Sequence, residues 1–294
     1  MPSITSGKPC LAASGRDQPS ATTASASSSA RSTFARLRSM AGRGPKDLDS
    51  ILMLLKTYPS PTLDRLTRFL SSASGSDKVL MLIQYFSKIV VWYALRRNKS
   101  MLAQQVRNLA GPVSDYRILS RFTGLIPLVH YMCALERNPP TNRYLLRLAR
   151  LENLCNLIYY PLEHAYWLGA HGIVPALASP KRVDQLGVWS CRFWAGYVVL
   201  HYLTLYEEYR QADRLKRRIL ADKAEANPAA FQAKLDTWHR QRRDWWIQFA
   251  INTAYFPLTI HWSYPASTFP DVGVGICGTI AALAQVYSGW KALG

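Results

Sequence analysis

The sequence contains six histidines and five cysteines, the side chains most typical of zinc sites. No two histidines are four residues apart, and no His-Glu-x-x-His motif occurs. The cysteines are more than twenty residues apart in the sequence and include no Cys-x-x-Cys pair. We therefore predict reduced cysteines and no metal site.

The stretch GVGICG, residues 273–278, matches the G-x-G-x-x-G pattern of dinucleotide-binding loops. Such a loop joins a strand to a helix, and an acidic residue follows about twenty positions later. No strand is predicted before this stretch, and no acidic residue follows it. We therefore expect no cofactor, and the protein is not predicted to be an enzyme.

The charge of the chain favours an anionic partner. Lysine and arginine number 36 against 18 acidic residues, for a formal net charge of +18. Lipid headgroups, nucleic acid and acidic protein surfaces would all satisfy this charge. Residues 1–46, rich in Ser, Ala and Arg, are predicted to be a disordered basic tail, with a mitochondrial transit peptide as the alternative.

From Leu48 onward, apolar residues recur every three or four positions, without sustained alternation of period two. This periodicity predicts an all-α fold. Helices are expected at 47–57, 61–72, 76–97, 100–109, 114–137, 141–172, 182–225, 228–263 and 272–291. We divide the chain into the tail 1–46, an N-terminal amphipathic region 47–138, a helical region with a basic segment 139–244, and a hydrophobic anchor region 245–294.

The segment 76–97 is the most informative of these helices. On a helical wheel, Asp77, Gln84, Ser87 and Lys88 share a narrow polar wedge. The rest of the wheel is a broad apolar face, predicted to insert into a membrane, that consists of Val79, Leu82, Ile83, Phe86, Ile89, Val90 and Tyr93.

Lys88 decides how this helix is expected to meet a membrane. Spanning the bilayer would place Lys88 near its centre at a cost of about 3 kcal/mol, whereas lying in the interface avoids that cost. We therefore expect an interfacial helix, with a helix buried in a soluble bundle as the alternative. A second basic helix, 114–136, repeats the pattern. The basic residues expected at anionic headgroups are Lys78, Lys88, Arg96, Arg97, Arg117 and Arg121.

The C-terminal segment Val272 to Trp290 has nineteen residues without a charge. At helical rise this is about 28 Å, enough to cross the hydrocarbon core, so a transmembrane helix is predicted. Segment 245–263 is also uncharged, and we leave open whether it forms a second span. The small residues that would let another helix approach in the membrane are Gly275, Gly278, Thr279 and Ala282.

The segment SDKVLMLIQYFSKIVVWY resembles the G/S-x-D-K-x-x-x-x-x-Q-Y-x-S/A block of the peroxisomal biogenesis factor 11 family. The resemblance continues in order through SDYRILSRFTGLIPLVHYM, RFWAGYVVLHYLTLY and VGVGICGTIAALAQVYSGW, over roughly residues 50–291. It implies a membrane-associated helical bundle with interfacial amphipathic helices and one or two C-terminal transmembrane segments.

The resemblance also implies a function. The protein would reside in the peroxisomal membrane with its N-terminus in the cytosol, insert residues 76–97 into one leaflet, and promote curvature, elongation and fission. The partners so implied are an anionic phospholipid membrane, further copies of the chain, and a dynamin-related GTPase with its adaptor. Two alternatives stay open: a membrane-bound carrier or pore, and a basic helical scaffold that binds nucleic acid, although we expect no nucleic acid.

Overall fold

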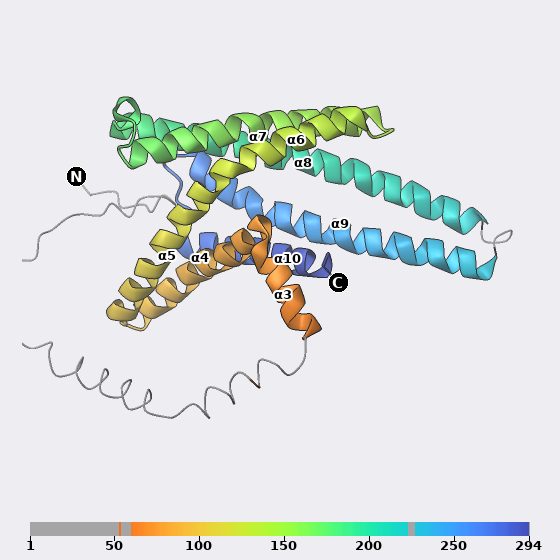
Figure 1. Ribbon diagram of the computed structural model, residues 1–294, viewed down its shortest axis with the longest axis horizontal. Coiled ribbons are helices and arrows are strands. Elements are labelled where there is room, and N and C mark those ends of the chain that lie inside the picture. Colours follow the sequence, from red (N-terminus) through yellow and green to blue (C-terminus); the bar gives the residue numbers. More distant parts are fainter. Residues whose placement is uncertain (1–52, 54–59, 223–226, 294) are drawn as a thin grey trace, which may run out of the picture. The chain divides into compact units, whose positions relative to one another are not determined.

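The computed structural model of the protein describes residue 53, residues 60–222 and residues 227–293 (Figure 1). The predicted tail and, apart from Met53, the helix predicted at 47–57 lie outside these residues. The chain forms two compact units, and the described residues from Phe69 onward belong to one of them. The described residues up to Arg68 belong to the other and comprise Met53, Ser60 and the start of α3.

Within these ranges the chain is helical, and no strand occurs among the described residues. The prediction of an all-α fold is therefore confirmed. The helices are α3 (Pro61–Ser71), α4 (Ala73–Arg96), α5 (Ser100–Ser120), the 3₁₀ turn η1 (Arg121–Gly124), α6 (Leu125–Arg137), α7 (Arg143–Ala170), the 3₁₀ turn η2 (Pro175–Leu177), α8 (Pro180–Ala221), α9 (Pro228–Ser263) and α10 (Asp271–Lys291).

Short polar side chains fix where several of these helices begin. Ser72 Oγ accepts a hydrogen bond from the backbone N–H of Gly75 at the start of α4. Asn142 caps α7 through Tyr144 N–H, and Asn227 caps α9. These caps satisfy backbone donors that have no partner inside the helix. The turn between α4 and α5 contains Asn98, whose φ of 55° is the left-handed conformation that asparagine tolerates at helix ends.

Pro112 does not end a helix, contrary to the boundary predicted between 109 and 114. It lies inside α5, and the helix runs on to Ser120. Proline removes one backbone hydrogen bond, but the packing of α5 along α4 holds both halves of the helix in place. The helix predicted at 114–137 is instead divided by η1, and it continues as α6.

Two sets of helices pack within the unit that begins at Phe69. In one, α4 lies between α5 and α10, and α10 also contacts α9. In the other, α7, α8 and α9 pack in sequence, and α8 and α9 form the long antiparallel hairpin drawn from teal to blue in Figure 1. The main core cluster joins α4, α9 and α10 and consists of Met81, Tyr85, Ala254, Leu258, Val274, Ala281 and Ala282.

Among the described residues, three helical stretches are long and apolar enough to cross a membrane. They are α4, the stretch Ser100–Arg137 that comprises α5, η1 and α6, and α10. The predicted C-terminal span therefore corresponds to α10. The possible second span, 245–263, is the end of α9, which is not among the three.

Candidate membrane-facing surface and polar cavity

Helix α4 exposes part of its apolar face. Phe86 and Tyr93, both predicted to insert into a membrane, are each 53% exposed. They are seven residues apart, so they lie on the same side of the helix. The other predicted inserting residues are partly buried: Leu82 packs against the main core cluster, and Ile89 lies against Gly275 of α10. The outward apolar face is thus narrower than the wheel suggested.

The polar wedge of α4 faces inward. Gln84 and Ser87 are 7% and 6% exposed. Gln84 Nε2 donates to Ser114 Oγ of α5 at 2.6 Å, and Gln84 Oε1 accepts from Arg117. Arg117 also binds Asp77 with two hydrogen bonds, from Nε to Oδ1 at 2.7 Å and from Nη2 to Oδ2 at 3.2 Å. Asp77 and Gln84 are therefore satisfied by α5, whereas Ser87 donates to a backbone oxygen of α4 itself.

The basic residues predicted at lipid headgroups divide into two groups. Arg96 and Arg97 are exposed at the end of α4 and lie over the rings of Trp92 and Tyr93, 4.6 and 5.5 Å from the ring centroids. By contrast, the structure places the other predicted headgroup residues against protein. Lys88 Nζ lies 3.4 Å from Asp271 Oδ1, Arg117 pairs with Asp77, Arg121 pairs with Glu163, and the partly buried Lys78 lies near Gly289.

Other helices of the same set also expose large apolar side chains. On α10, Ile276, Ile280, Leu283 and Tyr287 recur at helical spacing along one face. Exposed apolar side chains of this size suit lipid better than water when they gather on one surface. The exposed apolar residues of α5 and α6 are Met101, Leu102, Leu109, Tyr116, Leu119, Ile126, Val129 and Tyr131.

The small residues predicted on α10 lie against α4. A Cβ atom added to Gly278 would lie 2.1 Å from Cγ of Tyr85, and one added to Gly275 would lie 3.0 Å from Cβ of Lys88. Ala282 is fully buried, whereas Thr279 is partly exposed. Close approach of α10 to α4 therefore depends on glycine at 278.

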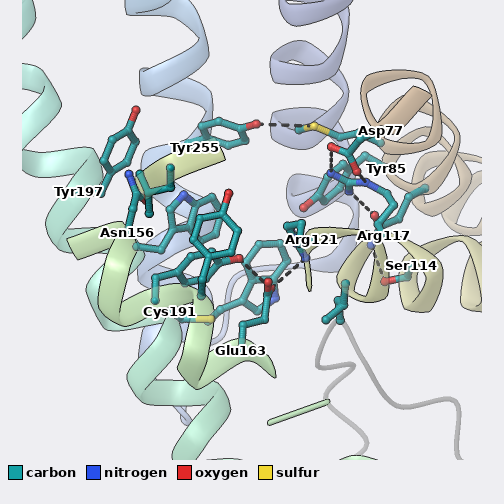
Figure 2. A pocket seen from close by; sticks show the side chains of 18 residues that line it. Asp77, Tyr85, Ser114, Arg117, Arg121, Asn156, Glu163, Cys191, Tyr197 and Tyr255 are labelled. Atoms are coloured by element: carbon teal, nitrogen blue, oxygen red, sulfur yellow. Dashed lines mark hydrogen bonds and ion pairs between the residues drawn. The ribbon is translucent and has the colours of Figure 1, made fainter. Parts of the chain in front are cut away.

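A cavity of about 360 Å³ lies behind α4, where its polar wedge meets α5 and the α7–α9 helices (Figure 2). Its wall combines four charged groups with phenol and indole rings. Its lining residues are Asp77, Met81, Gln84, Tyr85, Ser114, Arg117, Ile118, Arg121, Leu128, Asn156, Tyr159, Tyr160, Glu163, Cys191, Trp194, Tyr197, Tyr255 and Trp262.

Two ion pairs supply the charge of the cavity. Besides Arg117 and Asp77, Nη2 of Arg121 lies 2.9 Å from Glu163 Oε1, which also accepts the hydroxyl of Tyr159 at 2.7 Å. Oε2 of Glu163 is buried without a hydrogen-bond partner among the described residues. The side chains of Arg117 and Glu163 are 8% and 10% exposed, while those of Asp77 and Arg121 are 32% and 30% exposed.

The remaining polar groups of the cavity carry no charge at neutral pH. Burial raises the pKa of the phenols that line it, Tyr159, Tyr160, Tyr197 and Tyr255. A raised pKa keeps each hydroxyl protonated and able to donate a hydrogen bond. Two arginines and two carboxylates therefore set the formal charge of the cavity, and that charge sums to zero.

The described residues contain no cluster of metal-ligating side chains, and the pKa of Cys155 is not lowered. No group of three or more His, Cys, Asp or Glu side chains in this part of the chain could hold a metal ion. None of Cys133, Cys155, Cys191 and Cys277 forms a disulfide bond. Burial raises the pKa of Cys155, which disfavours the reactive thiolate.

Sequence reasoning missed the contribution of α7 to this site. Glu163, Tyr159 and Asn156 line the cavity, but the sequence analysis assigned them no role. Glu163 carried a usable signal, because it is an acid in an otherwise apolar and aromatic stretch. Its partner, Arg121, is far away in the sequence, so the pair could not be identified without the fold.

Comparison with known proteins agrees with this architecture. A model of the family "Peroxisomal biogenesis factor 11" matches residues 63–290. The chain is 22% identical to peroxisomal membrane protein 11B of Arabidopsis thaliana over 78% of its own length and 97% of that protein. It is 21% and 20% identical to the peroxisomal membrane proteins PMP30A and PMP30B of Candida boidinii, over 46% and 60% of its length and 53% and 70% of theirs. No solved structure matches significantly. Because the family match covers most of the chain, the protein belongs to the peroxisomal biogenesis factor 11 family.

Proposed function

We propose that this member of the peroxisomal biogenesis factor 11 family resides in the peroxisomal membrane and elongates it before division. Family membership supports a role in peroxisome proliferation. The names of the relatives from Arabidopsis thaliana and Candida boidinii support residence in the peroxisomal membrane. The finer proposal concerns the mechanism, in which α4 inserts its exposed apolar side into the cytosolic leaflet.

The observation that supports this mechanism is the orientation of α4. Its polar side chains bind α5 and α10, while Phe86 and Tyr93 face outward. A helix that carries bulky apolar groups into one leaflet expands that leaflet and favours positive curvature. At the end of α4, Trp92 with Arg96 provides the aromatic and cationic pair typical of a membrane interface.

The basic residues at the end of α4 favour the cytosolic face. Arg96 and Arg97 are exposed, and each can contribute about 1 kcal/mol near an anionic leaflet. In this arrangement α10 anchors the chain, and the N-terminus faces the cytosol. Self-association along a tubule would concentrate the curvature, and a dynamin-related GTPase with its adaptor would then sever the membrane.

Substitution of the exposed side chains tests the mechanism in cells. The full-length chain carrying Phe86→Glu and Tyr93→Glu should still reach peroxisomes through α10, yet should not elongate them when overproduced. The wild-type chain should give longer or more numerous peroxisomes, measured by imaging against a matrix marker. A matched control places the same charges on α8 as Leu215→Glu and Leu220→Glu, which are exposed there by 43% and 49%.

The control variant should elongate peroxisomes as the wild-type chain does. If the Phe86→Glu, Tyr93→Glu chain elongates them equally well, α4 does not drive the elongation. If the abundant wild-type protein leaves peroxisome shape and number unchanged, remodelling itself is refuted, and membrane residence alone remains.

A carrier or pore is the second candidate function. The observation in its favour is the polar cavity, which α4, α5 and α6 line together with the helices of the α7–α9 set. Ionisable groups inside a membrane protein often mark a solute path. Flux of small solutes across vesicles that contain the purified chain would test this candidate, and Arg117→Gln should lower that flux.

A further inference from the structure

We propose that the cavity behind α4 binds the headgroup of a zwitterionic phospholipid, such as a phosphatidylcholine, whose acyl chains remain in the surrounding membrane. This proposal concerns the cavity and not the exposed face of α4. It can therefore fail while the elongation mechanism stands, and the reverse also holds.

The surroundings of the cavity indicate an amphiphilic ligand. The helices that line it turn apolar side chains outward directly beside it: Phe86 follows Tyr85 on α4, and Tyr116 precedes Arg117 on α5. Ile126, on α6 close to the lining residue Leu128, is 77% exposed. A ligand with a polar head and an apolar tail would satisfy both the interior and these outer surfaces.

The size of the cavity limits what enters it. Sites for small molecules typically have volumes of about 300–1,000 Å³. At about 360 Å³ the cavity is at the lower end of this range. It therefore suits a headgroup, while two acyl chains would have to remain outside.

The charges of the wall select a headgroup without net charge. Arg117 and Arg121 are balanced by Asp77 and Glu163, each within ion-pair distance. A ligand with a net charge would leave that charge uncompensated in a poorly hydrated site, which is costly. A zwitterionic headgroup carries equal positive and negative charge. Its phosphate can therefore pair with an arginine and its ammonium with a carboxylate without adding net charge to the cavity.

Arginine donors and aromatic rings suit the two halves of such a headgroup. Arg117 uses three of its five N–H donors, one each on Nε, Nη1 and Nη2, in hydrogen bonds to described residues. The donors that remain, together with the half-exposed Arg121, suit a phosphate. The rings of Tyr160 and Trp194 line the same cavity and suit an ammonium group by cation–π attraction, while the hydroxyl of Tyr197 can donate to a phosphate.

Two lining residues allow a test that spares the fold. The side-chain amide of Asn156 and the hydroxyl of Tyr197 make no hydrogen bond with another described side chain or backbone group. Asn156→Leu and Tyr197→Phe would therefore remove ligand contacts without removing a described hydrogen bond. Leu283→Asn and Tyr287→Phe on the exposed face of α10 provide matched controls.

The experiment measures lipid retained by the full-length chain after purification in detergent, by native mass spectrometry with thermal unfolding as the folding control. Dioleoyl phosphatidylcholine should be retained in a fixed ratio and should outcompete dioleoyl phosphatidylglycerol. Asn156→Leu and Tyr197→Phe should each weaken phosphatidylcholine binding about threefold to tenfold, the effect of one hydrogen bond. The α10 controls should bind as the wild type does.

Free phosphocholine distinguishes a lipid from its soluble headgroup. It should compete only weakly, because it has no acyl chains to contact the apolar surroundings. Competition by phosphocholine as strong as that by the lipid would overturn the lipid assignment. Equal retention of phosphatidylglycerol would overturn the charge argument. No lipid on the wild-type chain, or binding unchanged by both cavity variants, would overturn the site.

Discussion

Two arginine–aspartate pairs show how differently two regions of this chain are built. Arg117 binds Asp77 at 2.7 Å between α5 and α4, and Arg217 binds Asp213 at 2.9 Å along α8. The Arg117 side chain is 8% exposed, whereas that of Arg217 is 80% exposed. The first arginine depends on its protein partners for stabilisation of its charge, while water can stabilise the second.

The α8–α9 hairpin has both inward and outward aromatic side chains: Trp246 is 53% exposed, whereas Trp238 and Trp245 are partly buried. On the α8–α9 hairpin, the indole N–H of Trp245 donates to the backbone oxygen of Leu205 and that of Trp238 to Ala212, both at 2.8 Å. These rings lie between the helices, while α4 and α10 turn Phe86, Tyr93 and Ile280 outward. Among the described residues, α8 and α9 are not apolar enough to cross a membrane, whereas α4 and α10 are. We therefore infer that the hairpin around Arg217 faces water and that the α4–α5–α10 set faces lipid.

The largest expected effect comes from breaking the buried pair. Arg117→Met should lower the free energy of unfolding by about 3 kcal/mol, the lower end for a buried pair, because Asp77 is 32% exposed. The loss arises because Asp77 would keep its charge without a partner and Gln84 would lose a donor. Chemical unfolding of the purified chain in detergent, followed by circular dichroism, measures the loss.

The double variant Asp77→Leu, Arg117→Met sharpens this expectation. It removes both charges, so it should recover most of the stability that Arg117→Met loses. If the double variant is as unstable as the single one, the pair matters through packing and not through charge.

Much of the architecture followed from the sequence because it depends on local signals. Asn142 and Asn227 mark where α7 and α9 begin, and both helices lie within about two residues of their predicted ranges. The uncharged C-terminal segment became α10, with Gly278 facing another helix. Helical periodicity and small residues at fixed spacing act within one segment, so they can be read without the fold.

The environment of the polar wedge could not be predicted, because its partners are distant in the sequence. The helical wheel considers segment 76–97 in isolation from other helices, and it therefore predicts Lys88 at lipid headgroups. In the fold, Lys88 meets Asp271, which is 183 positions away, and Gln84 meets Ser114. A paired lysine also weakens the argument that Lys88 prevents α4 from entering a membrane deeply.

Substitution of two glycines compares how closely α10 packs against α4 with how closely α8 packs against α7. Gly278→Ala should destabilise the chain by about 1–3 kcal/mol, since its Cβ would lie 2.1 Å from Cγ of Tyr85. Gly196→Ala on α8 is the matched control, because its Cβ would meet only Sγ of Cys155 at 3.4 Å. That variant should be neutral or more stable by up to about 1 kcal/mol.

Thermal unfolding of both glycine variants in the same detergent would compare them. If Gly278→Ala is as neutral as Gly196→Ala, α10 has room to move away from α4, and the two regions do not differ in packing.

An intermediate effect is expected at Lys88. Its side chain is 24% exposed and that of Asp271 is 65% exposed, so water already stabilises part of this pair. Lys88→Met should therefore cost about 1 kcal/mol or less in the free energy of unfolding. The measurement is the same chemical unfolding, repeated at high salt, where the difference between Lys88→Met and the wild type should shrink.

The smallest effect is expected at Arg217, where the same side-chain change that is severe at Arg117 should be nearly silent. Arg217 and Asp213 are four residues apart on the surface of α8, and such pairs contribute about 0.3–0.5 kcal/mol. Because methionine is as good a helix former as arginine, Arg217→Met should change the free energy of unfolding by no more than that amount. A loss above about 2 kcal/mol would show that this surface of the hairpin is buried against another molecule or another part of the chain. In that case the contrast between a water-facing hairpin and a lipid-facing α4–α5–α10 set would have to be abandoned.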